Sequence, residues 1–231
     1  MLPIAAILVD FDGTACLHDV AEHLLTEFGD PSWPEYDTAV DRGEMGLREA
    51  GDRQVALLSG TREEMLGFVL RHCPLDPTFP PFVVWSEARG IPVSLISDGF
   101  GFYIEPILAT AGLAHLAVIS NELVFDGEAA RLRRPHGHPV CVGCGTCKMN
   151  AVLRARERGP VVLVGEGQSD RYGALYADVV FAKDALVEIA TADGVPFLPW
   201  RTFDDVRAAV GSLEEPPGAV APERCPGWTA A

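Results

Sequence analysis

The chain has 231 residues and carries 33 acidic against 18 basic side chains, which gives a formal net charge of −15. With 48% hydrophobic and 22% charged residues, its composition is that of an ordinary globular protein, and its acidic balance argues against a nucleic acid or an anionic membrane as partner. No apolar run reaches the ~18–20 residues of a membrane-spanning helix, and the apolar residues 1–9, which lack a basic leader, are predicted to form a buried strand, not a signal peptide.

Short, largely apolar segments alternate with helical patterns along the chain, and each segment ends in a cluster of polar and turn-forming residues. These segments are Ile4–Val9, Pro92–Ile96, Val161–Val164 and Val179–Ala182. Apolar strands of this length that alternate with helices are typical of a parallel sheet covered on both faces. The predicted fold class is therefore α/β, with a Rossmann-like parallel sheet whose ligands bind at the carboxyl ends of the strands.

A helical insertion is predicted between the first two strands. Four stretches there have helical spacing, namely His18–Phe28, Pro34–Arg42, Leu47–Leu58 and Arg62–His72. Four helices exceed what one crossover needs, so residues 17–85 are predicted to form a cap inserted into a core of residues 1–16 and 86–213.

Two further features follow in the second half of the chain. Val118–Phe125 and Glu128–Arg133, joined through Asp126-Gly127, are predicted to form a β-hairpin. The Gly/Pro/Ala-rich residues 214–231 are predicted to form a flexible tail.

Three of the six cysteines lie within seven residues, a spacing unlike a disulfide framework, and the predicted compartment is the reducing cytoplasm. Thiols and imidazoles this close suit tetrahedral Zn²⁺, for which the candidate ligands are His136, His138, Cys141, Cys144 and Cys147. A structural zinc there would fix the start of the next helix. A polar loop with unligated thiols is the alternative, and a [4Fe–4S] cluster is less expected because the C-x-x-C-x-x-C-x-x-x-C-P run is incomplete.

Two carboxylates, Asp10 and Asp12, come directly after the first strand in the segment DFDGT. If the chain stays extended, they project to the same side, and two close carboxylates call for a divalent cation or a shared proton. One could attack phosphorus while the other acts as general acid and then base, with Mg²⁺ neutralising charge. An ordinary acidic turn is the alternative explanation.

Polar residues at the other strand ends support the chemical interpretation. The Ser97 hydroxyl and the Gly99 amide could donate hydrogen bonds to phosphate, and Lys148 could supply positive charge. Glu166 and Asp170 could complete an oxygen shell for Mg²⁺. Each residue alone has an ordinary structural explanation, but in this order at successive strand ends they indicate phosphoryl transfer.

The series DFDGT, SDG, Lys and GExxxD resembles the four motifs of the haloacid dehalogenase (HAD) superfamily of aspartyl-phosphate hydrolases, over Ile4 to Val210. The resemblance implies a Rossmann-like core with a helical cap inserted after its first strand. It also implies Asp10 as nucleophile and Asp12 as acid/base. The implied Mg²⁺ ligands are Asp10, the Asp12 carbonyl, Glu166 and Asp170, and the implied phosphate ligands include Ser97 and Lys148.

The chain is more closely similar to the phosphoserine-phosphatase-like branch, and within it to the 2-hydroxy-3-keto-5-methylthiopentenyl-1-phosphate phosphatases of methionine salvage. The segments that carry this similarity are Cys144–Lys148, Phe181–Asp184 and Leu198–Trp200. Phosphoserine phosphatases usually have a Glu nine residues after the nucleophile and a cap arginine for the serine carboxylate. The matching positions here are Asp19 and Gln54, with Arg53 beside it, so phosphoserine is the weaker substrate expectation.

The cap residues expected to contact substrate are His18, Asp19, Arg53 and Gln54. Two positions depart from the superfamily pattern: Glu166 replaces an Asp, and Asp98 replaces the commoner Gly. The predicted function is a Mg²⁺-dependent phosphomonoesterase acting on a small phosphorylated metabolite, as a monomer or homodimer. The alternatives are a phosphoserine-type phosphatase and a catalytically weakened relative that binds a phosphorylated ligand.

Overall fold

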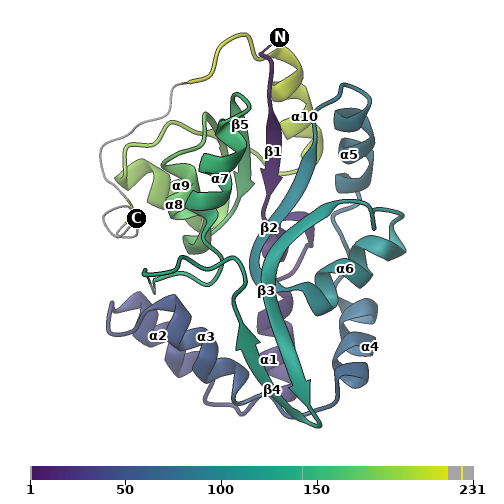
Figure 1. The fold of residues 1–231 in the computed structure, drawn as a ribbon, viewed down its shortest axis with the longest axis vertical. Coiled ribbons are helices and arrows are strands. Elements are labelled where there is room, and N and C mark those ends of the chain that lie inside the picture. Colours follow the sequence, from purple (N-terminus) through teal and green to yellow (C-terminus); the bar gives the residue numbers. More distant parts are fainter. Residues whose placement is uncertain (1, 142, 218–224, 226–231) are drawn as a thin grey trace.

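The computed structural model describes residues 2–141, 143–217 and 225, and its centre is a single seven-stranded sheet (Figure 1). The strand order is β4-β3-β2-β1-β5-β6-β7, and every pair is parallel except β3 with β4. The strands are β1 (Ala6–Val9), β2 (Val93–Phe100), β3 (Ala117–Asp126), β4 (Ala129–Arg133), β5 (Val161–Gly165), β6 (Val179–Ala182) and β7 (Leu198–Pro199). The predicted α/β class with a mostly parallel sheet is confirmed.

Two helical layers cover the sheet, and strand β1 shows why its sequence is apolar throughout. Ile7 and Val9 face a core cluster that includes Phe203, whereas Ala6 and Leu8 face a second cluster that includes Val152. Because successive side chains of a strand point to opposite faces, a strand buried on both faces needs an unbroken apolar run. The covering helices are α5 (Phe79–Glu87), α6 (Gly101–Thr110) and α10 (Phe203–Ser212) on one face, and α7 (Lys148–Arg156), α8 (Arg171–Ala174) and α9 (Asp184–Ala192) on the other.

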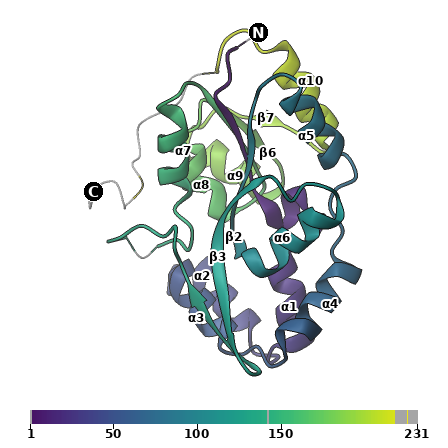
Figure 2. The ribbon, with the colours of Figure 1, turned by 45° about the vertical axis from the view of Figure 1, so that its right-hand side comes forward.

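Four helices of the inserted segment lie together beyond the carboxyl ends of the central strands (Figure 2). They are α1 (Val20–Phe28), α2 (Pro34–Asp41), α3 (Leu47–Val55) and α4 (Arg62–His72), close to the four predicted ranges. Helix α4 begins with a capping box, in which Thr61 and Glu64 satisfy each other's backbone N–H groups.

Helix α5, although it lies inside the predicted cap range, packs against the core helix α10. Its Phe79 and Phe82 rings lie 4.8 and 5.2 Å from the Phe203 ring, centroid to centroid. The predicted cap range therefore includes one helix that covers the sheet.

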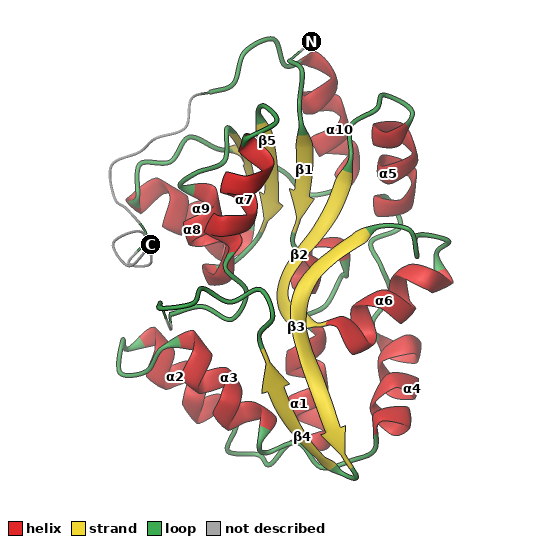
Figure 3. Ribbon diagram, viewed as in Figure 1, coloured by secondary structure: helices red, strands yellow, loops and turns green. Residues whose placement is uncertain are grey.

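The β3–β4 hairpin extends past the rest of the sheet to the cap helices (Figure 3). Asp126 pairs with Ala129 across the turn, and Gly127 adopts φ +61°, a left-handed conformation that glycine accepts without strain. At the other end of β4, Arg134 donates a hydrogen bond of 2.8 Å to the Arg48 carbonyl of α3. The predicted hairpin is confirmed, and it joins the sheet to the cap.

Two remaining expectations concern the membrane and the tail. Within the described part of the chain, no helix has the length and apolar character needed to span a bilayer. The predicted tail, 214–231, falls mostly outside the described residues.

Candidate active site

The polar residues predicted from the strand ends come together at the carboxyl edge of the sheet. Asp10 follows β1, Ser97 and Gly99 lie in β2, and Glu166 follows β5, and all four line one cavity of about 230 Å³ between the sheet and the cap. Adjacent parallel strands end at the same edge, which is why residues far apart in sequence meet there.

Lys148 is the buried cation of the site. It is the first residue of α7 and is 2% exposed. Its Nζ donates to Asp10 Oδ1 at 2.7 Å, to Asp170 Oδ1 at 2.6 Å and to Ser169 Oγ at 3.0 Å. Burial on its own would lower the pKa of Lys148, but the adjacent carboxylates, chiefly Asp10 and Asp170, raise the pKa above its ordinary value. The lysine is therefore charged and holds the two carboxylates in place.

Asp12 is held by three donors from three elements. Tyr103 Oη of α6 donates to both carboxylate oxygens at 3.0 Å, and Ser97 Oγ donates to Oδ2 at 3.1 Å. The Val20 N–H at the start of α1 donates to Oδ1 at 3.0 Å. Burial, then the charge of Asp19, raise the pKa of Asp12 to about 7. A carboxyl group with such a pKa can both give and take a proton near neutral pH.

Tyr103 was not foreseen from the sequence. It lies in the apolar helix α6 between Phe102 and Ile104 and is fully buried. Its only sequence signal is that a buried tyrosine hydroxyl requires a hydrogen-bond partner, which does not say which residue that partner is.

Gly99 serves the site through its missing side chain. A Cβ atom at Gly99 would collide with the Tyr103 hydroxyl and with the Asp12 carboxylate. Its N–H, predicted to bind phosphate, donates to Ser97 Oγ at 2.8 Å in this structure, because the turn closes the amide onto that hydroxyl. Gly99 thus makes room for the Asp12–Tyr103 contact.

Asp98, one of the two departures from the superfamily pattern, links β2 to the loop before Lys148. Its Oδ1 accepts a hydrogen bond of 2.6 Å from the Thr146 N–H. Its main-chain oxygen accepts another, also 2.6 Å, from Asn121 Nδ2. The carboxylate is buried, and burial raises its pKa. Asp98 therefore positions the segment that presents Lys148.

Glu166, the other departure, is accommodated by Gly13. A Cβ atom at Gly13 would lie 3.1 Å from Glu166 Cδ, and Gly13 itself adopts φ +66°. The longer side chain thus occupies space above a residue that has no side chain. Burial, then the charge of Asp170, raise the pKa of Glu166 to about 7.

Four acidic side chains, Asp10, Asp12, Glu166 and Asp170, lie at this edge of the sheet, and the Lys148 ammonium contacts two of them, Asp10 and Asp170. Burial raises the pKa values of Asp10 and Asp12. Such an uncompensated oxygen-rich set fits Mg²⁺, which would offset the repulsion. The Lys148 ammonium group lies between the Asp10 and Asp170 carboxylates and donates a hydrogen bond to each. No group of three or more His, Cys, Asp or Glu side chains in residues 2–141, 143–217 and 225 is already arranged around a metal position.

Of the four predicted substrate contacts in the cap, Asp19 and Gln54 line the cavity, and His18 and Arg53 do not. Helix geometry explains the difference between the neighbours Gln54 and Arg53. Positions three, four and seven residues apart share one helix face, and the α3 residues that line the cavity are Leu47, Ala50, Gly51 and Gln54.

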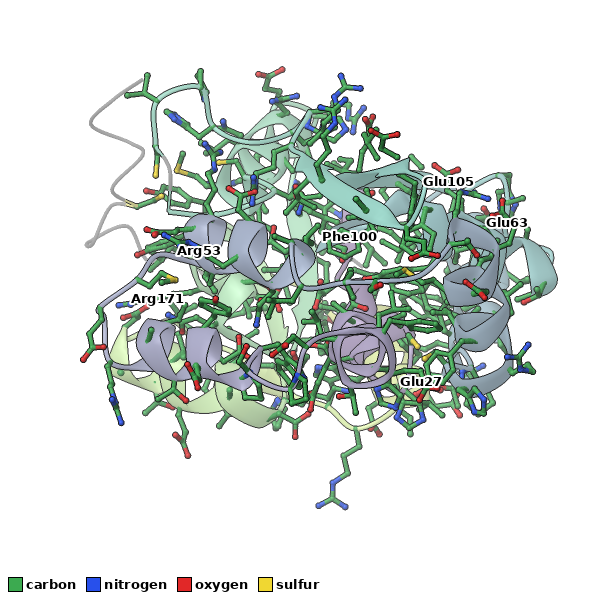
Figure 4. All side chains as sticks on the ribbon, turned by 90° about the horizontal axis from the view of Figure 1, so that it is seen from below. Glu27, Arg53, Glu63, Phe100, Glu105 and Arg171 are labelled. Atoms are coloured by element: carbon green, nitrogen blue, oxygen red, sulfur yellow. The ribbon has the colours of Figure 1, made fainter. Side chains whose placement is uncertain are left out.

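Arg53 points to the other side of α3. It forms an exposed ion pair of 3.3 Å with Glu49, and Figure 4 shows it on α3 apart from the cavity-lining Phe100. His18 is also exposed, with its ring 4.8 Å from that of His23.

Arg134, at the end of β4, is a cavity-lining cation that sequence reasoning missed. Its side chain is 12% exposed, and one terminal nitrogen donates to Asp52 Oδ1 at 2.8 Å. Its Nε is buried and has no hydrogen-bond partner within the described residues. An arginine beside this cavity can bind an anionic or strongly polar ligand group.

The predicted zinc set is not assembled. His136 is exposed and lines a different cavity, one that includes Leu8 and Ala151. His138 Nδ1 accepts hydrogen bonds from the N–H groups of Val140 and Cys141, at 3.1 and 2.8 Å. In the neutral ring the proton is then on Nε2, so His138 has no lone pair left for a metal. We therefore exclude the His136 and His138 imidazoles as ligands of this predicted zinc site.

The family model for haloacid dehalogenase-like hydrolases matches residues 7–174, more than half of the chain. The chain belongs to this family. Two similar HAD proteins are the 2-hydroxy-3-keto-5-methylthiopentenyl-1-phosphate phosphatases of Geobacillus kaustophilus and Bacillus velezensis. The first is 31% identical over 213 residues, covering 90% of this chain and 96% of the relative. The second is 28% identical over 217 residues, covering 90% and 91%.

Two solved structures show the same fold. A substrate-bound phosphoserine phosphatase complex aligns with TM-score 0.71 at 15% identity, covering 93% of this chain and 100% of the other. A phospho-aspartyl intermediate analogue of phosphoserine phosphatase aligns with TM-score 0.70 at 18% identity, covering 90% and 98%. The family and its named relatives make the chain a HAD-type phosphatase, as the motifs predicted.

Proposed function

We propose that the protein hydrolyses a small phosphorylated metabolite through a phosphorylated Asp10, in a Mg²⁺-dependent reaction. The observation that carries the proposal is the buried Asp10–Lys148–Asp170 array, with contacts of 2.7 and 2.6 Å, beside an Asp12 held by Tyr103. An array of this kind fixes a nucleophile, a cation and an acid/base group at one cavity, which is what phosphoryl transfer requires.

The proposed reaction has two steps. Asp10 attacks phosphorus, and the bond to the leaving oxygen breaks as Asp12 gives that oxygen its proton. Asp12 then takes a proton from water, whose oxygen attacks phosphorus and breaks the bond to Asp10, which releases phosphate and restores the Asp10 carboxylate and the protonated Asp12. Lys148 would hold Asp10 in line and offset charge on the phosphoryl oxygens.

Mg²⁺ would be held by Asp10, the Asp12 carbonyl, Glu166 and Asp170, and when bound it would neutralise the negative charge of carboxylates and phosphate. Glu166 gives the test of this assignment. Glu166→Ala should weaken the Mg²⁺ dependence of activity, so that more Mg²⁺ is needed for half-maximal rate, whereas Glu166→Asp should keep or raise activity. If Glu166→Ala matched wild type at limiting Mg²⁺, Glu166 would have no part in binding the ion.

For the substrate, we propose the enol phosphate named in the relatives, 2-hydroxy-3-keto-5-methylthiopentenyl 1-phosphate. The part of the cavity next to the cap supports a leaving group with both polar and apolar parts. Leu47, Ala50, Phe100 and Leu132 line it beside Arg134. The apolar residues suit a methylthio chain, and the arginine suits its oxygens.

Phosphoserine is the second substrate to test, because structural neighbours carry the name phosphoserine phosphatase. The position that matches the cap arginine of phosphoserine phosphatases is Gln54, and the adjacent Arg53 is 60% exposed and outside the cavity lining.

The test is a kinetic screen of phosphorylated metabolites, including both compounds, with and without Mg²⁺. We expect hydrolysis only with Mg²⁺ and the highest kcat/KM for the enol phosphate. Asp10→Asn should lower kcat by more than about 10³-fold, whereas the matched change Asp126→Asn, at the exposed hairpin tip, should not. Comparable turnover by wild type and Asp10→Asn would refute the proposal.

A further inference from the structure

Four cysteine side chains line a small cavity that also includes Lys148 and that shares Ser169 with the cavity lined by Asp10 and Asp12. Cys141 and Cys144 lie in the loop after β4, Cys147 is the N-cap residue of α7, and Cys225 comes from the C-terminal segment. All four line the same cavity, together with Met149 and Tyr172 among others. Three of these cysteines are close in sequence, but the fourth is brought there by the fold.

Cys225 is buried against the core. It is 3% exposed and belongs to the apolar cluster that contains Val152 and Leu186. Its N–H donates a hydrogen bond of 3.1 Å to Tyr176 Oη. A residue from the Gly/Pro-rich end of the chain thus reaches the loop that precedes Lys148.

We propose that Cys141, Cys144, Cys147 and Cys225 form a four-thiolate site for a thiophilic metal centre. Four sulfur ligands select Zn²⁺ or an iron–sulfur cluster over Mg²⁺ or Ca²⁺, because soft thiolates bind soft or borderline metals. In the described residues, these four side chains do not yet converge on one metal position. Each sulfur, however, can move between staggered χ1 positions without moving the backbone.

The loop already offers support for a sulfur ligand. The Gly143 N–H donates to Cys141 Sγ at 3.5 Å, the type of hydrogen bond that stabilises a metal-bound thiolate. His138 Nδ1 accepts a hydrogen bond of 2.8 Å from the Cys141 N–H, which fixes the backbone of that ligand. Histidine therefore shapes the loop, and sulfur supplies the ligands.

The order of the cysteines favours an iron–sulfur cluster. A run of C-x-x-C-x-x-C with a distant fourth cysteine followed by proline is the ligand arrangement of bacterial [4Fe–4S] proteins, and Cys225 is followed by Pro226 in the sequence. The fourth ligand that the local sequence lacks is thus supplied by the C-terminal segment. Zinc has the same ligand chemistry and is the second possible occupant.

The site would tie three parts of the molecule together. Arg48 of the cap donates to the Cys144 carbonyl at 3.2 Å, and Cys147 directly precedes the catalytic Lys148. A metal centre on these cysteines would hold the C-terminal segment, the loop and the start of α7 in one arrangement.

The test is metal analysis of the untagged protein purified without oxygen. Iron, acid-labile sulfide and zinc are measured per chain, and the visible absorption of a cluster is recorded. We expect about four irons and four sulfides per chain. About one zinc in their place would support the four-thiolate site with zinc as its occupant. Absence of both metals would overturn the proposal.

Variants test the ligand set. Cys144→Ser and Cys225→Ser should each reduce metal content at least about tenfold, whereas Cys73→Ala, a buried cysteine outside the cluster, and His136→Ala should retain it. Circular dichroism checks that each variant is folded. Wild-type metal content in folded Cys225→Ser would exclude the fourth ligand and with it the site.

Discussion

Two clusters of reactive side chains lie next to the start of α7, and they differ in how they are assembled. The proposed catalytic cluster, which includes Asp10, Ser97 and Glu166, takes its residues from the ends of β1, β2 and β5, which the sheet aligns. The thiol cluster takes three residues from one loop and one from the end of the chain. Lys148 belongs to both clusters, because it contacts Asp10 and also lines the thiol cavity.

The comparison shows which site depends on the sheet. The positions of Asp10 and Glu166 are set by buried strands that pair in register, Val9 with Val164. The positions of Cys141 and Cys144 are set by a loop, which holds its shape through side-chain contacts such as His138 with the Cys141 N–H. Substitutions in the catalytic cluster should therefore affect chemistry most, and substitutions in the thiol cluster should affect metal content.

The largest effect is expected for Lys148→Met, which removes the cation shared by Asp10 and Asp170. Two buried carboxylates would lose their partner, so we expect a loss of about 3–5 kcal/mol in the free energy of unfolding and a kcat below one-thousandth of wild type, roughly. Urea unfolding and steady-state kinetics measure both. Arg154→Met, on the exposed face of the same helix, is the matched control and should change neither.

Gly99→Ala should come next, because its Cβ would collide with Asp12 and the Tyr103 hydroxyl. We expect kcat to fall about 10²-fold or more, with a loss of about 1–3 kcal/mol in stability. Gly211→Ala, inside helix α10, is the control. Its Cβ would lie at an ordinary contact distance of 3.6 Å from the Trp85 side chain. Because alanine favours helix more than glycine does, this change should stabilise the protein slightly. Unchanged kinetics in Gly99→Ala would show that catalysis does not need Asp12 in its position against the Tyr103 hydroxyl.

Tyr103→Phe should have a smaller effect on the same group. It removes one donor to both Asp12 oxygens and leaves the Ser97 and Val20 donors in place. We expect kcat to fall about tenfold, the equivalent of one hydrogen bond to a charged group, with KM nearly unchanged. Tyr36→Phe in α2 serves as control, and an equal loss in both variants would contradict the role given to Tyr103.

The smallest effect is expected far from both clusters, at Asp205 in the first turn of α10. The N–H groups of Thr202 and Arg201 donate to its carboxylate at 3.1 and 3.0 Å and lower its pKa. Stability from this group is present above the ordinary Asp pKa and is lost as pH falls through the lowered value. Asp205→Asn should therefore lower Tm by about 1–3 °C at pH 7, and the difference should shrink as pH falls below the ordinary Asp pKa of about 3.9. Activity and metal content should stay unchanged.

Much of this molecule could be predicted from its sequence, for physical reasons that differ by element. Strands such as β5 could be found because burial on both faces demands an apolar run, and α4 could be delimited by its capping box. Asp10, Asp12 and Glu166 could be found because strand ends share one edge of the sheet.

Tyr103, Arg134 and Cys225 could not be found, because each depends on a tertiary contact that has no local pattern. The partner of Tyr103 is 91 positions away in the sequence. The place of Arg134 beside the cavity depends on how far the hairpin reaches toward α3. Arg53 is expected near the substrate because it lies beside the position that matches a substrate contact of the family, but the sequence does not show which face of α3 it occupies, and in the structure it lies outside the cavity lining.

The central claim is that Asp10 carries the phosphoryl group during turnover. The most direct measurement is to quench the enzyme during steady-state hydrolysis, reduce the acyl phosphate with borohydride, and locate the product by peptide mass spectrometry. We expect homoserine in place of Asp10, formed only with substrate present and absent from Asp10→Asn. A reduced residue at another position, or turnover by Asp10→Asn at the wild-type rate, would contradict it.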